Sequence, residues 1–109
     1  MSYNINGVEH ETDDQGYLLE PIFDDDAVKV IAAAEGIALS EAHWVVVNYL
    51  RDEYREHGHT PNFRNMLKGM TALNPEMDSK SLYDLFPIGP AKQGPKVAGL
   101  PQPLGKGGY

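Results

Sequence analysis

The sequence contains no cysteine in its 109 residues. The chain therefore offers no disulfide, no thiolate metal ligand, no thiol nucleophile and no thiol that could hold a persulfide. Basic residues are also few, with nine lysines and arginines against sixteen acids and a net charge of −7. This charge disfavours nonspecific binding to nucleic-acid backbones and anionic membranes, although it leaves room for a local basic patch.

Long apolar segments are absent as well. No run approaches the roughly 18 residues that a membrane span needs, and the N-terminus lacks the basic and apolar regions of a signal peptide. The sequence thus predicts no membrane segment and favours a soluble, cytoplasmic protein. Its length and its apolar content of 41% fit one domain that buries a modest core.

The N-terminal segment carries the signals of a small β-meander. Asn6-Gly7 separates residues 3–5 from residues 8–12, and this dipeptide is typical of a two-residue hairpin turn because both positions tolerate positive φ. Residues 17–19 predict a short third strand.

Capping residues and apolar periodicity predict helices at 27–35, 41–57, 61–69 and 79–85. The expected caps are Asp24 or Asp25, Ser40, Thr60 followed by Pro61, and Asp78 or Ser79. Pro90 opens a fifth helix, but we expect it to break or restart at Pro95, because an interior proline costs about 3 kcal/mol.

The apolar residues of the first three helices define the faces expected to be buried. They are Ala27, Val30, Ile31 and Ala34; Trp44, Val47, Leu50 and Tyr54; and Phe63, Met66, Leu67 and Met70. The predicted fold class is α+β and mostly α, with a small N-terminal β-meander or hairpin packed on an array of about five helices.

The C-terminal segment differs in composition from the rest of the chain. From Pro87 onward it holds five prolines, six glycines, three lysines and no acid. We therefore divide the single domain into a globular body at residues 1–86 and a Pro/Gly-rich C-terminal arm at residues 87–109.

No metal-binding or catalytic group is complete in the sequence. His57 and His59 occupy a helix end, where imidazoles are common, and two further ligands at suitable spacing are not evident. Asp24, Asp25 and Asp26 lack the alternating ligands and closing glutamate of a calcium loop, so helix capping is the better interpretation. We predict no cofactor and no metal.

Helix 61–69 allows a second interpretation. A short glycine turn joins it to helix 41–57, as in a helix-turn-helix. Its polar side holds residue types that can contact base edges, namely Asn62, Arg64, Asn65 and Lys68. The alternative, a solvated face of a small bundle, is favoured by the acidic body. DNA binding is therefore the second hypothesis.

Five parts of the sequence match one family. They are DQGYL at 14–18; GIALSEAHW at 36–44; Leu50-Arg51 with Tyr54; Pro61 with Arg64; and LYDLFPIGPAKQ at 82–93 followed by KVAGLPQP at 96–103. Through them the chain resembles the DsrC/TusE family of small sulfur-relay proteins, also described as the gamma subunit of dissimilatory sulfite reductase. The family fold, a small β-meander on about five helices, agrees with the elements predicted above.

The resemblance also implies a sulfur-carrying arm, from which this chain departs. Sulfur carriers of the family read GPAKQACK in the arm and end in PTGC or similar, and the cysteine near the C-terminus holds the persulfide. DsrC proper has a second, earlier cysteine that can form a disulfide with it. These two positions are Pro95 and Lys106 here. A protonated amine cannot accept sulfane sulfur as a thiolate does.

We therefore expect a non-catalytic, regulatory-type member, rather than an enzyme, that docks to sulfur-relay or sulfite-reductase-type partners, such as DsrEFH-like or TusBCD-like complexes, or regulates them. The residues expected to contact the partner are Arg64, Lys68, Lys92, Lys96, Leu100, Pro101 and Pro103. Two alternatives stay open. One is a DNA-binding transcriptional regulator of sulfur-oxidation genes acting through helix 61–69, and the other is a TusE-type sulfur carrier in transfer RNA 2-thiolation, which the absence of cysteine disfavours.

Overall fold

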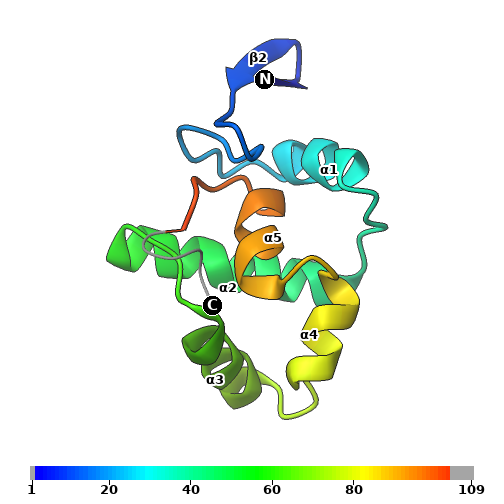
Figure 1. The fold of residues 1–109 in the computed structure, drawn as a ribbon, viewed down its shortest axis with the longest axis vertical. Helices are drawn as coiled ribbons and strands as arrows, with labels where there is room; N and C mark the ends of the chain where they lie inside the picture. Colours follow the sequence, from blue (N-terminus) through cyan, green and yellow to red (C-terminus); the bar gives the residue numbers. More distant parts are fainter. Residues whose placement is uncertain (1, 104–109) are drawn as a thin grey trace.

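The computed structural model describes residues 2–103. This part of the chain forms, in order, β1 (Ser2–Ile5), β2 (Val8–Glu11), α1 (Asp25–Ala34), α2 (Glu41–His57), α3 (Phe63–Leu73), α4 (Ser79–Leu85) and α5 (Pro90–Val97). The hairpin lies at one end of the molecule and α3 and α4 at the other, with α5 between them (Figure 1). The predicted fold class, α+β and mostly helical, is confirmed. None of the helices in residues 2–103 is long and apolar enough to cross a membrane.

The N-terminal hairpin forms as predicted. β1 and β2 pair antiparallel, and the turn residues Asn6 and Gly7 have φ values of 54° and 84°. The predicted third strand is reduced to a single antiparallel bridge between Thr12 and Leu18. Leu18 is only 2% exposed, so this segment serves to fill the core rather than to extend the sheet.

Three of the predicted helix caps are confirmed. The side chains of Asp24, Ser40 and Asp78 accept hydrogen bonds from backbone N–H groups at the starts of α1, α2 and α4. The cap of α2 is reciprocal, because His43 Nδ1 accepts from the Ser40 N–H at 3.0 Å. The ring proton of His43 is therefore on Nε2, which donates to the Leu85 carbonyl at 2.9 Å and ties the start of α2 to the end of α4.

Helix α3 differs from its predicted bounds. Asn62 rather than Thr60 caps it, and the helix continues to Leu73 instead of ending near Gly69. The Asn62 side chain accepts a hydrogen bond from the Asn65 N–H at 2.9 Å, so the helix begins directly after Asn62. A single glycine within such a face costs only about 1 kcal/mol, too little to end the helix.

In α2 and α3 every residue of the predicted face is buried or half-buried, whereas the face of α1 differs in part. Met66 and Met70 are buried in α3. In α1 the buried residues are Ala27, Val28, Ile31 and Ala32, whereas Val30 is half-buried and Ala34 exposed. Alanine and valine occur on most sides of α1, so the apolar periodicity does not determine which side of this helix is buried. In α2 the buried set is His43, Val46, Val47, Leu50 and Arg51, with Trp44 and Tyr54 at its edges.

Candidate functional site

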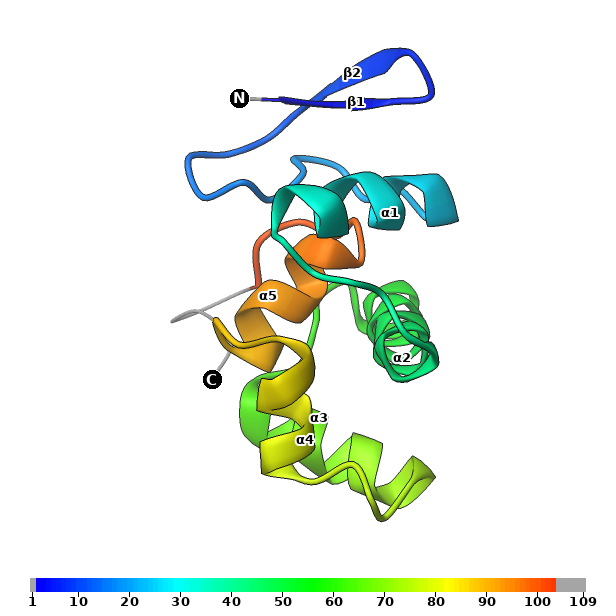
Figure 2. The same cartoon turned by 90° about the vertical axis from the view of Figure 1, so that its right-hand side faces the viewer.

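Helix α5 lies at the centre of the molecule. It contacts α1, α2, α3 and α4, and Figure 2 shows it between α1 and the α3–α4 end, beside α2. Its buried residues are Pro90, Ala91, Gln93, Gly94, Pro95 and Val97. The first half of the predicted arm is thus packed into the core, while the division of the domain at residues 86 and 87 stays a prediction.

The predicted break at Pro95 is wrong, since α5 runs through this residue to Val97. Hydrogen bonds continue beyond the proline, from the Ala98 N–H to the Gly94 carbonyl at 2.9 Å and from the Leu100 N–H to the Pro95 carbonyl at 3.0 Å. A Cβ on Gly94 would lie 3.0 Å from Leu50 Cδ1, so glycine lets α5 approach α2 closely. Burial of this turn outweighs the local cost of the proline.

A shielded polar group holds α5 against the end of α1. Gln93 Nε2 donates to Glu35 Oε1 at 3.1 Å, and Gln93 Oε1 accepts from the Ile88 N–H at 3.1 Å. Lys96 Nζ lies 3.6 Å from the same Glu35 oxygen, and both side chains are 17% exposed. Sequence reasoning missed Glu35. The only indication in the sequence is that Glu35 is an acid at the C-terminus of a helix, where the helix dipole disfavours negative charge.

Tyr17 adds a second anchor for α5. Its hydroxyl donates to the Lys92 carbonyl at 2.9 Å, and Lys96 Nζ lies 5.2 Å from its ring centroid. Burial, followed by the carboxylates of Asp13 and Glu35, raises the pKa of Tyr17 to about 12. Tyr17 is therefore a neutral hydrogen-bond donor throughout the physiological pH range.

The segment after α5 passes close to the N-terminal half of the chain. The Ile22 N–H donates to the Gly99 carbonyl at 2.9 Å. Gly99 has a φ of 80°, and a Cβ there would lie 2.7 Å from the Ile22 carbonyl oxygen. Gln102 Nε2 donates to Gln15 Oε1 at 3.2 Å. The loop preceding α1 therefore fixes the direction in which the chain leaves the core.

A pocket of about 180 Å³ opens at the start of α5. It is lined by Phe63, Tyr83, Ile88, Gly89, Pro90, Ala91 and Lys92. The Phe63 and Tyr83 ring centroids are 5.4 Å apart. Ile88 is 69% exposed and Tyr83 is 44% exposed, so apolar side chains face solvent beside a lysine. Sequence reasoning singled out Lys92 here but missed the apolar neighbours.

The residues predicted to contact a partner fall into two groups. Arg64 and Lys68 are exposed one turn apart on α3, and Lys92 lines the pocket. The others are turned toward the fold: Lys96 in its pair with Glu35, Leu100 fully buried, Pro101 half-buried and Pro103 buried. The role of all seven residues in partner binding stays a prediction.

The residues predicted to contact DNA lie in the first half of α3 and just before it. Asn62 uses its side-chain oxygen to cap the helix, whereas Arg64, Asn65 and Lys68 are exposed. This is also the arrangement of a solvated helix face. DNA binding through it stays a prediction.

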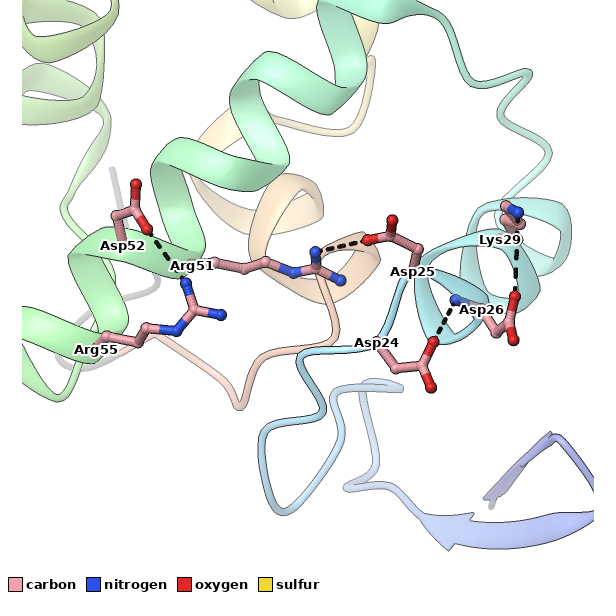
Figure 3. Close-up of polar contacts among 7 residues, drawn as sticks. All are labelled: Asp24, Asp25, Asp26, Lys29, Arg51, Asp52 and Arg55. Atoms are coloured by element: carbon pink, nitrogen blue, oxygen red, sulfur yellow. Dashed lines mark hydrogen bonds and ion pairs between the residues drawn. The ribbon is translucent and has the colours of Figure 1, made fainter.

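The acids at the start of α1 serve the helix and its neighbours. Figure 3 shows Asp24 accepting from the Asp26 N–H at 2.8 Å and Asp26 facing Lys29 at 4.0 Å. Asp25 Oδ1 accepts from Arg51 Nη1 at 2.9 Å (Figure 3). Asp24 is the cap of α1, so the interpretation of this cluster as a helix cap is confirmed.

Of the two positions that hold cysteine in the sulfur carriers of the family, the structure describes only Pro95. Pro95 is buried within α5, one residue from the close contact between Gly94 and Leu50. Lys106 lies outside the described residues. Neither position supplies a thiol, because the sequence contains no cysteine.

Solved structures with this arrangement of elements define the class of protein. The NMR structure of DsrC from Allochromatium vinosum has a TM-score of 0.86 and 34% sequence identity, covering 95% of this chain and 96% of that one. The oxidized gamma-subunit of the dissimilatory sulfite reductase (DsrC) from Archaeoglobus fulgidus has a TM-score of 0.85 and 30% identity, covering 96% of this chain and 98% of that one. The fold is thus that of a DsrC protein.

The family follows from the sequence match. The family model described as DsrC like protein matches residues 4–105, and the chain belongs to this family. The Sulfurtransferase TusE homolog of Haemophilus influenzae is 47% identical over 103 residues, which is 92% of this chain and 94% of the relative. Sulfurtransferase TusE of Escherichia coli (strain K12) is 46% identical over the same shares of the two chains.

These relatives correct the main functional expectation. A non-catalytic protein that only docks or regulates was expected, because both cysteine positions are substituted. Relatives at 46 to 48% identity over 92% of the chain are instead named sulfurtransferases, which favours the alternative of sulfur transfer. The expectation of protein partners is confirmed at a coarse level, because a structural relative is the gamma-subunit of a larger enzyme.

Proposed function

We propose that this chain acts in sulfur transfer of the kind for which its TusE relatives are named. One observation carries the proposal: proteins named sulfurtransferase TusE match 92% of the chain at 46 to 48% identity. The likeness of the fold to DsrC at a TM-score of 0.86 supports it. A cytoplasmic place of action, expected from the sequence, is part of the proposal.

The chemistry of sulfane transfer constrains the role of this chain. A donor persulfide passes its outer sulfur to an acceptor thiolate, RS–SH + R′S⁻ → RS⁻ + R′S–SH, so that one S–S bond breaks, one forms and the proton stays on the transferred sulfur. Because the 109 residues hold no cysteine, both thiols belong to other proteins in this proposal. The contribution of the chain is to bind donor and acceptor so that their sulfurs meet in a productive orientation.

We place the partner contact at the pocket at the start of α5. Ile88 and Tyr83 expose apolar surface there, and Phe63 extends the pocket to α3, whose next residue is Arg64. An apolar centre beside basic residues suits a partner surface with an apolar side chain and nearby carboxylates. The partners that the resemblance suggests are DsrEFH-like or TusBCD-like complexes.

Substitution of the most exposed apolar residue tests this surface. Ile88→Asp should weaken binding to a purified TusBCD-like complex at least tenfold, because it places a charge in the apolar centre of the contact. Leu19→Asp is the matched control, since Leu19 is 59% exposed but belongs to the loop before α1. Equal binding by both variants and the unmodified chain would remove the pocket from the proposal.

Function is tested by replacement in cells. In a bacterium whose TusE gene is deleted, expression of this chain should raise the level of 2-thiolated transfer RNA above that of the empty vector. Ile88→Asp should raise it less than Leu19→Asp does at equal protein level. No increase with the unmodified chain, when it accumulates in folded form, would contradict the proposal.

A further inference from the structure

Three metal-ligating side chains meet at the C-terminal end of α2. Glu53 and His57 are one turn apart, and His57 Nε2 lies 3.9 Å from Glu53 Oε1. One ligand atom from each of Glu53, Glu56 and His57 can be chosen so that all lie within 4.8 Å of one another. Ligand atoms about 2.0–2.2 Å from a tetrahedral zinc ion lie roughly 3.3 Å apart. Small rotations of these side chains therefore suffice to close the group around an ion.

A second imidazole stands beside this group. Gly58 ends α2 in the left-handed conformation with a φ of 76°, which turns the chain directly after His57. The ring centroids of His57 and His59 are 6.1 Å apart, with 33° between the ring planes. Two imidazoles that share a zinc ion at about 2.0–2.1 Å per nitrogen have centroids roughly 5–6 Å apart. His59 is outside the group of three whose ligand atoms lie within 4.8 Å of one another, so its ring would have to turn toward the group to supply a fourth ligand.

The hydrogen bond of His59 also suits metal binding. His59 Nδ1 lies 3.3 Å from the carbonyl oxygen of Thr60. A carbonyl oxygen only accepts, so Nδ1 carries the ring proton and Nε2 has the lone pair that a metal ion needs. Donation of one ring N–H to a backbone carbonyl is the usual outer contact of a metal-bound histidine, because it fixes the tautomer and the ring orientation.

We propose that Glu53, Glu56, His57 and His59 form a binding site for a divalent transition-metal ion of the zinc type. Imidazole nitrogens favour Zn²⁺, Ni²⁺ and Cu²⁺ over Ca²⁺ and Mg²⁺, which prefer all-oxygen sites. The two carboxylates neutralise the ion, and the net charge of −7 favours its approach. From the sequence only the two histidines were evident, and α2 supplies the missing ligands. The proposal does not depend on the proposed sulfur transfer.

Calorimetric titration of the untagged full chain with Zn²⁺ tests the site. Saturable binding of one ion per chain is expected at neutral pH, and Mg²⁺ should bind at least tenfold more weakly. His57→Ala and Glu53→Gln should each weaken Zn²⁺ binding at least tenfold. His10→Ala and Glu41→Gln are the matched controls, an imidazole and an acid outside the group, and should bind as the unmodified chain does.

Two results would overturn the site. One is the absence of saturable Zn²⁺ binding up to about 1 mM, well above the range of useful metal affinity. The other is a Zn²⁺ affinity that neither His57→Ala nor Glu53→Gln changes, which would assign the ion to scattered surface acids. Both substitutions lie on the outer side of α2, and unchanged circular dichroism verifies that each variant is folded.

Discussion

Gly99 satisfies two requirements that no other residue type meets. Its φ is 80°, and a Cβ would come within 2.7 Å of the Ile22 carbonyl oxygen. Nothing in the local sequence reveals the second requirement, because Ile22 is brought there by the fold. Its two neighbours, Ala98 and Leu100, are fully buried, so the chain has little freedom to move away.

Gly99→Ala should destabilise the protein by about 3 kcal/mol or more, from left-handed strain plus the collision with Ile22. Gly36→Ala is the matched control, because Gly36 has a φ of 73° with no atom within 4 Å of the added Cβ. It should cost about 1–2 kcal/mol. Urea unfolding of both variants measures the difference, and equal losses would show that the Ile22 contact contributes nothing.

Tyr17 makes the free energy of unfolding decrease at alkaline pH. Its pKa is raised from 10.0 to about 12, first by burial and then by Asp13 and Glu35. The folded chain therefore binds the phenol proton more tightly than the unfolded chain does. The stability that this contributes is fully present below about pH 10 and is lost as the pH rises through about 12.

Unfolding free energies measured from about pH 8 to about pH 11 should accordingly fall with pH. Tyr17→Phe should be about 1 kcal/mol less stable at pH 8, because the hydrogen bond from the Tyr17 hydroxyl to the Lys92 carbonyl is lost, and should show a shallower fall above pH 10. Burial also raises the pKa of Tyr3 and Tyr49, so part of the slope should remain. An unchanged slope in Tyr17→Phe would contradict this assignment.

The ion pair between Arg51 and Asp25 could not be predicted from the sequence. The sequence marked Arg51 only as part of a family motif, yet its side chain is 7% exposed and bonds Asp25 from the neighbouring helix. Among residues 2–103 its Nε and Nη2 have no hydrogen-bond partner. Pairing between distant elements depends on how α1 crosses α2, which the local sequence does not contain.

The helices divide according to the range of the interactions that define them. Starts of α1, α2 and α4 were predictable because Asp24, Ser40 and Asp78 act on backbone groups two or three residues away. The path of α5 through Pro95 was not, because it depends on packing between Gly94 and Leu50. Local signals thus located most helix ends, and tertiary packing decided the C-terminal helix.

The start of α2 offers a test of this distinction. Ser40→Ala should cost about 1 kcal/mol, the usual loss of a helix cap. His43→Ala should cost about 2–4 kcal/mol, because it also leaves the Ser40 N–H and the Leu85 carbonyl without their partner and removes the edge contact with Phe86, whose ring centroid is 5.2 Å away. Thermal unfolding of both variants ranks them, and a smaller loss for His43→Ala would contradict the link between α2 and α4.

For the molecule as a whole, composition and motifs predicted the fold class and the family, whereas the pocket at the start of α5 could not be predicted from the sequence. Lys92 and the polar face of α3 were identified from charge, whereas the pocket beside Lys92 is assembled from α3, α4 and α5 and has no sequence signature. Lys96 was predicted from its charge to contact a partner, and the structure pairs it with Glu35; its role in partner binding stays a prediction. The sequence alone does not distinguish a lysine that packs against the fold from one that faces solvent.

The functional expectation failed for a different reason. The absence of cysteine favours a docking or regulatory protein over a sulfur carrier, but the match to sulfurtransferases extends over 92% of the chain and supports the alternative. Loss of a thiol removes one way of taking part in the reaction. In the proposed role the chain instead binds the two proteins that carry the thiols, and such binding depends on the fold that the chain shares with its relatives.

Transfer of labelled sulfane sulfur from one protein to another is the direct test of the proposed function. A persulfidated donor protein and an acceptor thiol protein of the relay are mixed with and without the unmodified chain, and the label on the acceptor is followed by gel and mass spectrometry. Substoichiometric amounts of the chain should make labelling of the acceptor faster. The mass of the chain itself should not increase by the roughly 32 Da of one sulfur atom. Labelling at the same rate with and without an equimolar amount of the chain would contradict the proposed function.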